Sequence, residues 1–470
     1  MHVSGRVLPI ENDQEASQPE NSTRIVWALA WPAVALNSMQ VINNLLDSTF
    51  IGHLPAAALT AQSGSMSVMF LMFSLAMALG TASTALVSRA YGAGNPEEFR
   101  MACRKTLSLS LLFGVLLAIV SMFVAEPSAR LLLPSDNPEA IGLMSRFLKV
   151  YAAGLPAVFL IQTLAGALRG IGDTKSPMVI SGIQILLHIA MNFVLIFPPR
   201  NTSFGVTIPG ANLGLEGAAT ALSVSAWLSA LAYLAYSGKT PLGAAWRLGL
   251  VESEWVKRIM RIALPAAGMA VLRVASLAVF TIALKMVPKG SDAIAGMRVG
   301  FALESIMFMP AFGLSMAASA LVGQSLGMKK PERAERLAWA AGHQAAIVTM
   351  ALVVPIFFLA PWISGMMIEG KPDIIAESTA LIRWLCITEI MFAYSMVTIG
   401  AMQGAGDTVR PLWITIISLW VLRVPLTFLC ANGLGWGSTG AWFAMSLSQA
   451  AQGVMAILAF RQGKWKTSKV

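Results

Sequence analysis

The stretch IVWALAWPAVALNSMQVINNLLDSTFIG, residues 25–52, decides the fold class of this chain. A helix of this length spans roughly 40 Å at about 1.5 Å per residue, which exceeds the ~30 Å hydrocarbon core of a bilayer. The segment is apolar over most of its length, yet it contains one carboxylate, Asp47, together with several amides. These amides are Asn37, Gln40, Asn43 and Asn44. We therefore predict a membrane-spanning helix with a polar face.

The spacing of these polar residues places most of them on one side of the helix. Asn37, Gln40, Asn44 and Asp47 follow one another at intervals of three, four and three residues, which is the helical repeat. A carboxylate at membrane depth costs at least a few kcal/mol, so it must line a wet cavity or have a partner. Hydrogen bonds between helices are an equally good explanation of the amides. Asp47 is therefore the first candidate functional residue.

Composition supports a membrane protein and excludes several other classes. The chain has 470 residues, of which 56% are hydrophobic and 12% charged, whereas soluble domains carry about 25% charged residues. The formal charge of +10 is spread over short loops, so we expect no nucleic-acid partner. The three cysteines lack CxxC spacing, so we expect neither disulfides nor a metal site, and we expect no cofactor.

Twelve apolar spans can be marked along the chain. They cover residues 25–51, 57–88, 102–125, 143–168, 177–198, 215–237, 258–287, 293–323, 336–361, 378–400, 411–431 and 438–461. With the N-terminus inside, 22 Lys and Arg residues lie in inner segments and 4 in outer loops. This asymmetry predicts a multi-pass protein of the inner (plasma) membrane with both termini in the cytoplasm.

An internal repeat organises the two halves. GALRGIGDTKSP at 166–177 returns as GAMQGAGDTVRP at 400–411, and TALVSRAYGAGNPE at 84–97 returns as SALVGQSLGMKKPE at 319–332. The nearly constant offset of 234 or 235 residues indicates a duplication. We predict two six-helix lobes related by a pseudo-two-fold axis along the membrane normal. The predicted parts are a flexible tail (1–23), an N-lobe (24–238), a linker (239–257), a C-lobe (258–461) and a basic cytoplasmic tail (462–470).

Two local motifs have structural interpretations. In each GxGDT sequence, glycine allows positive φ at the end of one helix and aspartate caps the next helix. Pro32 lies inside the first span and removes a backbone hydrogen bond, so we expect a kink there. The kink is either a static bend or a hinge that responds to the charge of Asp47.

Other titratable residues lie within the spans. His188 and Asn192 are four residues apart on one face of the fifth span, where His188 either shares a proton with Asp47 or is an ordinary interior histidine. In the second half, we favour structural ion pairs of Glu304 with Arg298 and of Glu389 with an arginine. The candidate partners of Glu389 are Arg273 and Arg423. A functional role for these charged residues stays open.

These motifs together resemble the multidrug and toxic compound extrusion (MATE) family over nearly the whole chain after residue 24. The resemblance rests on Pro32, on LLDSTFIGHL around Asp47, on ALVSRAYGAGN and ALVGQSLG, and on the paired ALRGIGDTKSP and AMQGAGDTVRP. Arg273 and Phe392 occupy positions where the NorM-like branch has a Glu and an Asp. The chain is therefore more similar to the DinF-like branch.

The resemblance implies an exporter of organic cations, drugs or metabolites that works by alternating access. The coupling ion is H⁺ or Na⁺, bound by Asp47 with His188 and Asn192. Gln40, Asn43, Asn44 and Thr220 line the first-lobe cavity, and Pro32 is the hinge. The expected partners are a cationic or amphiphilic small molecule and membrane lipid, and we expect a monomer.

Two other functions compete with this interpretation. A lipid or polysaccharide-precursor flippase of the same superfamily would use the arginines Arg273 and Arg423 to hold a headgroup. A membrane-embedded enzyme is less consistent with the sequence, because the four histidines form neither an HxxxH nor an HExxH pair.

Overall fold

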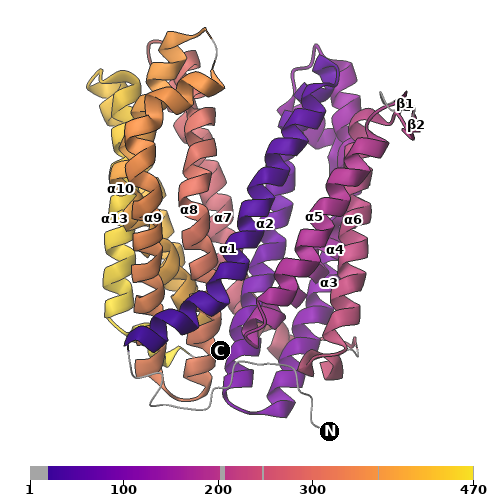
Figure 1. Ribbon diagram of the computed structural model, residues 1–470, viewed down its shortest axis with the longest axis vertical. Helices are drawn as coiled ribbons and strands as arrows, with labels where there is room; N and C mark the ends of the chain where they lie inside the picture. The colour runs from indigo at the N-terminus through magenta and orange to yellow at the C-terminus, as the bar shows by residue number, and fades with distance from the viewer. Residues whose placement is uncertain (1–18, 202–206, 246–247, 369, 469–470) are drawn as a thin grey trace. The chain divides into compact units, whose positions relative to one another are not determined.

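The computed structural model describes residues 19–201, 207–245, 248–368 and 370–468. Within this part of the chain, twelve segments are helical, long and apolar enough to cross a membrane, and each of the twelve predicted spans overlaps one of them (Figure 1). The predicted all-α polytopic fold is therefore confirmed.

The helices follow one another with short connections. The first half contains α1 (Pro19–Gly52), α2 (Ala56–Gly92), α3 (Pro96–Leu132), α4 (Pro138–Gly170), α5 (Lys175–Leu195) and α6 (Gly214–Ser237). The second half contains α7 (Ser253–Lys285), α8 (Gly290–Gly327), α9 (Pro331–Met367), α10 (Pro372–Gly404), α11 (Val409–Ile416), η3 (Ile417–Arg423), α12 (Val424–Thr427), η4 (Phe428–Gly433) and α13 (Gly437–Arg461). The segments from α11 to η4 form one span, in which η3 and η4 are π-helical.

Among the described residues, four short elements lie outside the spans. β1 (Arg200–Asn201) pairs antiparallel with β2 (Thr207–Ile208) between α5 and α6. η2 (Pro241–Ala245) and η5 (Lys464–Thr467) are 3₁₀ turns that follow α6 and α13.

The chain forms two compact units. One comprises Ser38–Ala90 and Asn95–Ala263, and the other comprises 19–37, Tyr91–Gly94 and the described residues from Leu264 onward. α1 therefore contributes its first part to the second unit and the remainder to the first unit. The predicted N-lobe, which starts at residue 24, differs from the observed first unit in this respect.

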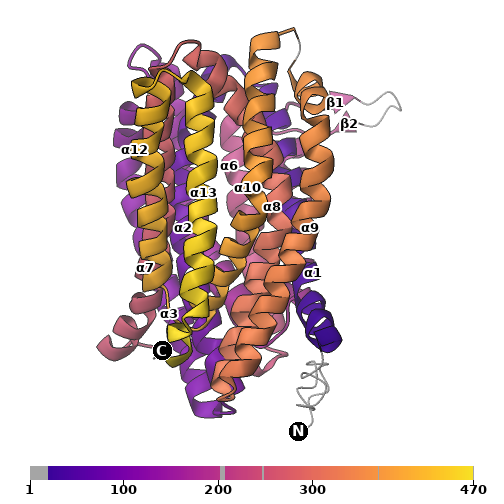
Figure 2. The ribbon, with the colours of Figure 1, turned by 90° about the vertical axis from the view of Figure 1, so that its left-hand side faces the viewer.

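Each unit has its own packed interior. In the first unit, α4 packs against α3 and α6, and α6 packs against α5 (Figure 1). In the second unit, α10 lies against α8, α9 and α13 (Figure 2). Fully buried large side chains such as Phe147 in the first unit and Trp442 in the second fill these interiors.

The sequence repeat returns as a repeated helix contact. A Cβ on Gly166 of α4 would lie 2.4 Å from the carbonyl oxygen of Gly80 on α2, so the two backbones touch. At the repeat offset, Gly400 of α10 meets Ser315 of α8, whose hydroxyl donates to the carbonyl of Met396 at 2.7 Å. Small residues at these positions allow the close helix approach that is common in membrane proteins.

The GxGDT turns have the predicted geometry. Gly172 and Gly406 have φ of 90° and 83°, a region that side chains other than glycine rarely adopt. One carboxylate oxygen of Asp173, and likewise of Asp407, accepts the backbone N–H three residues further on. Both turns therefore combine a glycine stop with an aspartate cap, as predicted.

The predicted flexible N-terminal tail needs correction where the structure describes it, and the basic segment at the other end is packed onto the second unit. α1 begins at Pro19, so the last five residues of the predicted N-terminal tail are helical, while residues 1–18 lie outside the described residues. At the other end, Trp465 is fully buried and stacks on Phe460 with a centroid separation of 4.7 Å, and Lys466 pairs with Glu335. An indole has enough apolar surface to fold this short basic segment back onto the second unit.

Candidate functional site

Asp47 lies in a hydrogen-bonded cluster formed by α1 and α5 within the first unit. The Nδ2 atom of Asn192 donates to one carboxylate oxygen of Asp47 at 2.7 Å, and the Nδ2 atom of Asn43 donates to the other at 3.4 Å. Both neighbours are buried, whereas 22% of the Asp47 side chain is exposed. The carboxylate is thus held by two amide N–H groups and still reachable.

His188 completes this cluster and is held in one tautomer. Its Nδ1 atom lies 3.2 Å from Oδ1 of Asn43, and its Nε2 atom lies 3.2 Å from Nδ2 of Asn192. Because the first neighbour only accepts and the second only donates, these contacts fit a neutral imidazole that carries its proton on Nδ1. The same Nδ1 atom lies 3.8 Å from Asp47.

Helical spacing explains why these four side chains meet. Asn43 and Asp47 are four residues apart on α1, and His188 and Asn192 are four residues apart on α5, so each pair occupies one face over a single turn. All four residues were predicted for the site, and the four-residue spacing puts Asn43 beside Asp47. The periodicity did not distinguish buried Asn43 from Gln40 and Asn44, which are exposed.

One polar atom of the cluster has no partner. Oδ1 of Asn192 is buried and makes no hydrogen bond to any described residue. An unpaired buried acceptor costs about 1–3 kcal/mol, so a water molecule, a proton donor or a cation is favoured beside it. The cluster therefore offers a carboxylate, an imidazole and a free amide oxygen within one helix turn.

Aromatic rings lie beside the cluster on α1, on α5 and just after the end of α5. Phe50 of α1 makes edge contacts with Phe193 and Phe197, with centroid separations of 6.2 Å each, and His53 contacts Phe197. This group was not predicted, although Phe50 stands three residues after Asp47 and Phe193 stands next to Asn192 in the sequence. Such rings offer apolar and cation–π surface beside a carboxylate.

Among the described residues, the remaining predicted site residues make no hydrogen bond to Asp47. Gln40 and Asn44 are exposed and bond to each other at 3.3 Å. Thr220 of α6 donates to the carbonyl of Glu216 in its own helix at 2.8 Å. Pro32 lies inside α1 in the part that belongs to the second unit. Their assignment to a cavity or a hinge stays a prediction.

A second polar cluster lies inside the second unit. Oε1 of Glu304 on α8 accepts a 2.8 Å bond from Gln449 of α13, whose Oε1 accepts from Thr388 of α10. Arg423, at the end of the π-helical η3, donates through Nε to Ser448 at 2.8 Å. π-Helical segments often mark functional or strained places in membrane helices. No local pattern in the sequence predicted a role for Gln449 or Ser448.

The predicted ion pairs of the second half are wrong. Among the described residues, no guanidinium nitrogen of Arg273, Arg298 or Arg423 lies within the 4.0 Å of an ion pair from Glu304 or Glu389. Both carboxyl oxygens of Glu389 are buried without a hydrogen-bond partner. Counting charges within spans predicted pairing, but it did not include the amides and hydroxyls that bind Glu304 and Arg423.

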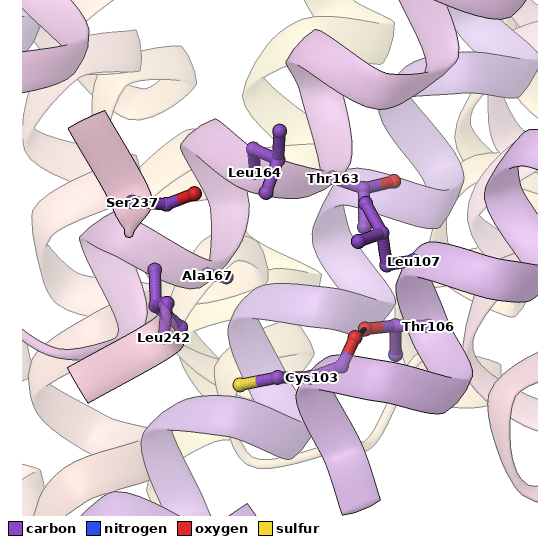
Figure 3. Close-up of a pocket in the computed structure, with 8 residues that line it drawn as sticks. All are labelled: Cys103, Thr106, Leu107, Thr163, Leu164, Ala167, Ser237 and Leu242. Carbon is purple, nitrogen blue, oxygen red and sulfur yellow. Dashed lines mark hydrogen bonds between the residues drawn. The ribbon is translucent and has the colours of Figure 1, made fainter. Parts of the chain in front are cut away.

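Two cavities within the first unit are distinct from the Asp47 cluster. The smaller one, of about 10 Å³, lies between α3, α4, α6 and η2 and is too small for more than one water molecule (Figure 3). Its lining includes Cys103, Thr163 and Leu242. The larger one, of about 620 Å³, lies between the end of α3 and the start of α4.

Comparisons with known proteins extend over most of the chain. The MatE family model matches residues 32–194 and 265–429. A probable multidrug resistance protein NorM from Thermotoga maritima is 29% identical over 449 residues, which cover 94% of this chain and 93% of the relative. The multidrug resistance protein PmpM of Pseudomonas aeruginosa is 27% identical over 405 residues, covering 85% and 82% respectively.

Solved structures agree with the fold. An outward-facing multidrug resistance MATE family transporter of the MOP superfamily superposes with a TM-score of 0.87 at 20% identity, over 100% of both chains. A MOP superfamily transporter from Pyrococcus furiosus gives a TM-score of 0.86, also at 20% identity and over 100% of both chains. Because the family model covers both halves of the duplicated sequence, this chain is a member of the MatE family.

Proposed function

We propose that this protein is a secondary active efflux transporter that exports cationic or amphiphilic small molecules in exchange for protons. Three findings support the proposal: the MatE family membership, the relatives named as multidrug resistance proteins, and the Asp47 cluster. The Asp47 cluster is the observation on which the coupling mechanism depends. Transport, and not chemical conversion, is the activity that we expect.

The geometry of the cluster suggests how protonation changes it. An ionised carboxylate only accepts hydrogen bonds, and Asp47 accepts one from Asn43 and one from Asn192. Protonation adds an O–H donor and removes an acceptor site, so one amide N–H group loses its partner. The buried cluster must then rearrange, because leaving a buried donor unpaired costs about 1–3 kcal/mol.

Alternating access follows if the two arrangements of the cluster favour different states of the transporter. Ionised Asp47 favours a cationic substrate, and an incoming proton neutralises it and releases the substrate. We further propose that α1 bends at Pro32 when the charge of Asp47 changes, because the proline leaves one carbonyl without its helical partner. Gln40, Asn44 and Thr220 are proposed to line the route of the substrate.

The donors around Asp47 favour a proton over Na⁺ as the coupling ion. A sodium ion needs several oxygen ligands, but Asp47 faces two amide N–H groups and an imidazole. Oδ1 of Asn43 is already engaged by His188, which leaves Oδ1 of Asn192 as the unengaged amide oxygen of the cluster. His188 lies close enough to exchange a proton with Asp47 after a small rearrangement.

The direct test is transport by purified protein in liposomes, driven by one gradient at a time. A fluorescent organic cation such as ethidium is followed under an imposed pH gradient, under a sodium gradient at equal pH, and without a gradient. We expect movement of the cation under the pH gradient alone. Movement that requires sodium would overturn the choice of ion, and no movement with any gradient would overturn the proposed function.

The proposed location is the plasma membrane, with both termini in the cytoplasm and a monomer as the functional form. The asymmetric distribution of Lys and Arg supports this orientation. The orientation is tested with single cysteines placed after residue 462 and in the loop after α3. Intact cells are treated with a membrane-impermeant thiol reagent, and we expect labelling only in the loop after α3. Labelling of the C-terminal cysteine in intact cells would contradict the proposed orientation.

A further inference from the structure

The larger cavity of the first unit has a lining that shares no residue with the Asp47 cluster. It is lined by the last turns of α3 and the first turns of α4, and its volume is about 620 Å³. The lining residues are Glu126, Arg130, Ser135, Pro138, Ile141, Gly142, Ser145 and Arg146. The predicted orientation places this end of the unit on the external side of the membrane. All the predicted external loops together contain only four Lys or Arg residues.

The cavity combines cationic donors with one carboxylate. Arg130 bonds Glu126 through Nη2, and Arg146 bonds Glu216 of α6 through Nε. A guanidinium has five N–H donors, so most donors of both arginines stay available. Glu216 does not line the cavity but neutralises Arg146, so the two arginines and their two glutamate partners sum to zero, which disfavours a ligand with a large net charge and favours one that carries both signs.

A serine in the cavity wall and an open position at Gly142 indicate room for a ligand. Ser145 lines the cavity and is only 6% exposed, so its hydroxyl is a hydrogen-bonding group for a molecule bound in the cavity. A Cβ built on Gly142 would meet no atom within 4 Å, so the floor of the cavity is empty at this position.

An apolar stripe leads along α3 to the cavity. Leu112, Leu116, Ile119 and Phe123 are exposed and follow one another at intervals of four, three and four residues, and Arg130 continues the same face. From Leu112 to Phe123 the stripe is about 16 Å long, close to half of the ~30 Å hydrocarbon core. An acyl chain of one leaflet therefore fits along this stripe with its headgroup at Arg130.

We propose that this cavity binds a phospholipid with a zwitterionic headgroup that contains a primary ammonium, of the phosphatidylethanolamine class. The phosphate is held by Arg130 and Arg146, and Ser145 supplies a further hydrogen bond. The ammonium is held by the carboxylate of Glu126. The acyl chains lie on the stripe of α3. The proposal does not depend on the transport mechanism, because none of these residues belongs to the Asp47 cluster.

Native mass spectrometry of the detergent-solubilised full chain tests the proposal. Dioleoyl-phosphatidylethanolamine, -phosphatidylcholine and -phosphatidylglycerol are added separately, and the bound fraction is measured. We expect the wild type to retain phosphatidylethanolamine at least about tenfold better than either other lipid, the factor expected from one additional charge-assisted hydrogen bond. Equal retention of the three lipids would overturn the proposal.

Two variants locate the binding in this cavity. Gly142→Leu places a larger apolar side chain at this open position, where an added Cβ atom meets nothing within 4 Å, and leucine is a better helix former than glycine, so we expect the variant to fold. We expect it to lose phosphatidylethanolamine retention while its thermal unfolding without lipid matches that of Gly142→Ala. Glu126→Gln removes the partner of the ammonium and should abolish the preference over phosphatidylglycerol. Unchanged retention in Gly142→Leu, or an unchanged preference in Glu126→Gln, would refute the assignment.

Discussion

Replacing Asn192 by alanine removes the shorter of the two hydrogen bonds that hold the Asp47 carboxylate. This bond is 2.7 Å long and runs from a buried amide to a charged acceptor, a class worth about 1.5–3 kcal/mol. The bond stabilises only the ionised form, so its loss favours the protonated form. At 1.36 kcal/mol per pH unit, the pH at which efflux is half maximal should rise by about 1–2 units.

The assay is cation efflux from proteoliposomes measured across a series of internal and external pH values at a fixed gradient. Ser181→Ala is a matched control on the same helix, α5. It removes the 2.8 Å hydrogen bond between the hydroxyls of Ser181 and Tyr233, which does not involve Asp47. We expect this control to keep the wild-type midpoint. If Asn192→Ala changes the efflux rate but leaves the pH of half-maximal efflux unchanged, the proposed role of this hydrogen bond is refuted.

Three further predictions concern stability, each measured by thermal unfolding in detergent. The hydrogen bond from Lys105 lowers the pKa of Glu252, so its stabilising contribution is present above the ordinary glutamate value of 4.5 and is lost as pH falls below it. The difference in unfolding temperature between wild type and Glu252→Gln should therefore vanish at acidic pH. A difference that grows at acidic pH would contradict the stabilising role of this ion pair. Gly166→Ala pushes a methyl group against the backbone of α2 and should cost about 1–3 kcal/mol or more, whereas no loss would disprove the close contact. Trp465→Ala should lower the free energy of unfolding by up to about 3–5 kcal/mol, because the buried ring of Trp465 stacks on Phe460. Trp465→Phe keeps an aromatic ring and should cost much less. Equal unfolding temperatures of both variants and wild type would exclude a packed C-terminal segment.

The arrangement of the helices was predictable because membrane spans have strong local signals. Apolar length, basic residues in loops and a constant repeat offset each point to the same twelve-helix fold. The turn geometry was also predictable, since glycine and aspartate in GxGDT have few other uses at a helix end. These signals lie in short stretches of sequence and need no knowledge of distant contacts.

The details of the polar clusters were only partly predictable. Spacing of four residues put Asp47 beside Asn43 and Asn192 beside His188, but helical periodicity does not say which helix lies opposite. Exposed Gln40 and Asn44 share the periodicity and were indistinguishable from buried amides. In the second unit, a glutamine 145 residues away in sequence binds Glu304, and no local pattern indicates such a partner.

Folding back of the C-terminal segment was missed for a related reason. A run of basic residues usually indicates a solvated tail, and one tryptophan within it changes the outcome because its indole is buried against Phe460. Composition averages over such single residues. A large aromatic side chain just after the last span is the signal that would have corrected the prediction.

The most direct test of the coupling mechanism is efflux by Asp47→Asn under an imposed pH gradient. Asparagine keeps the size of the side chain and its contact with Asn43, but it does not titrate between pH 5 and 9. We expect thermal unfolding close to that of the wild type, loss of pH-driven efflux, and no proton movement when substrate is added. Full pH-driven efflux by this variant would contradict the proposal that Asp47 carries the coupling proton.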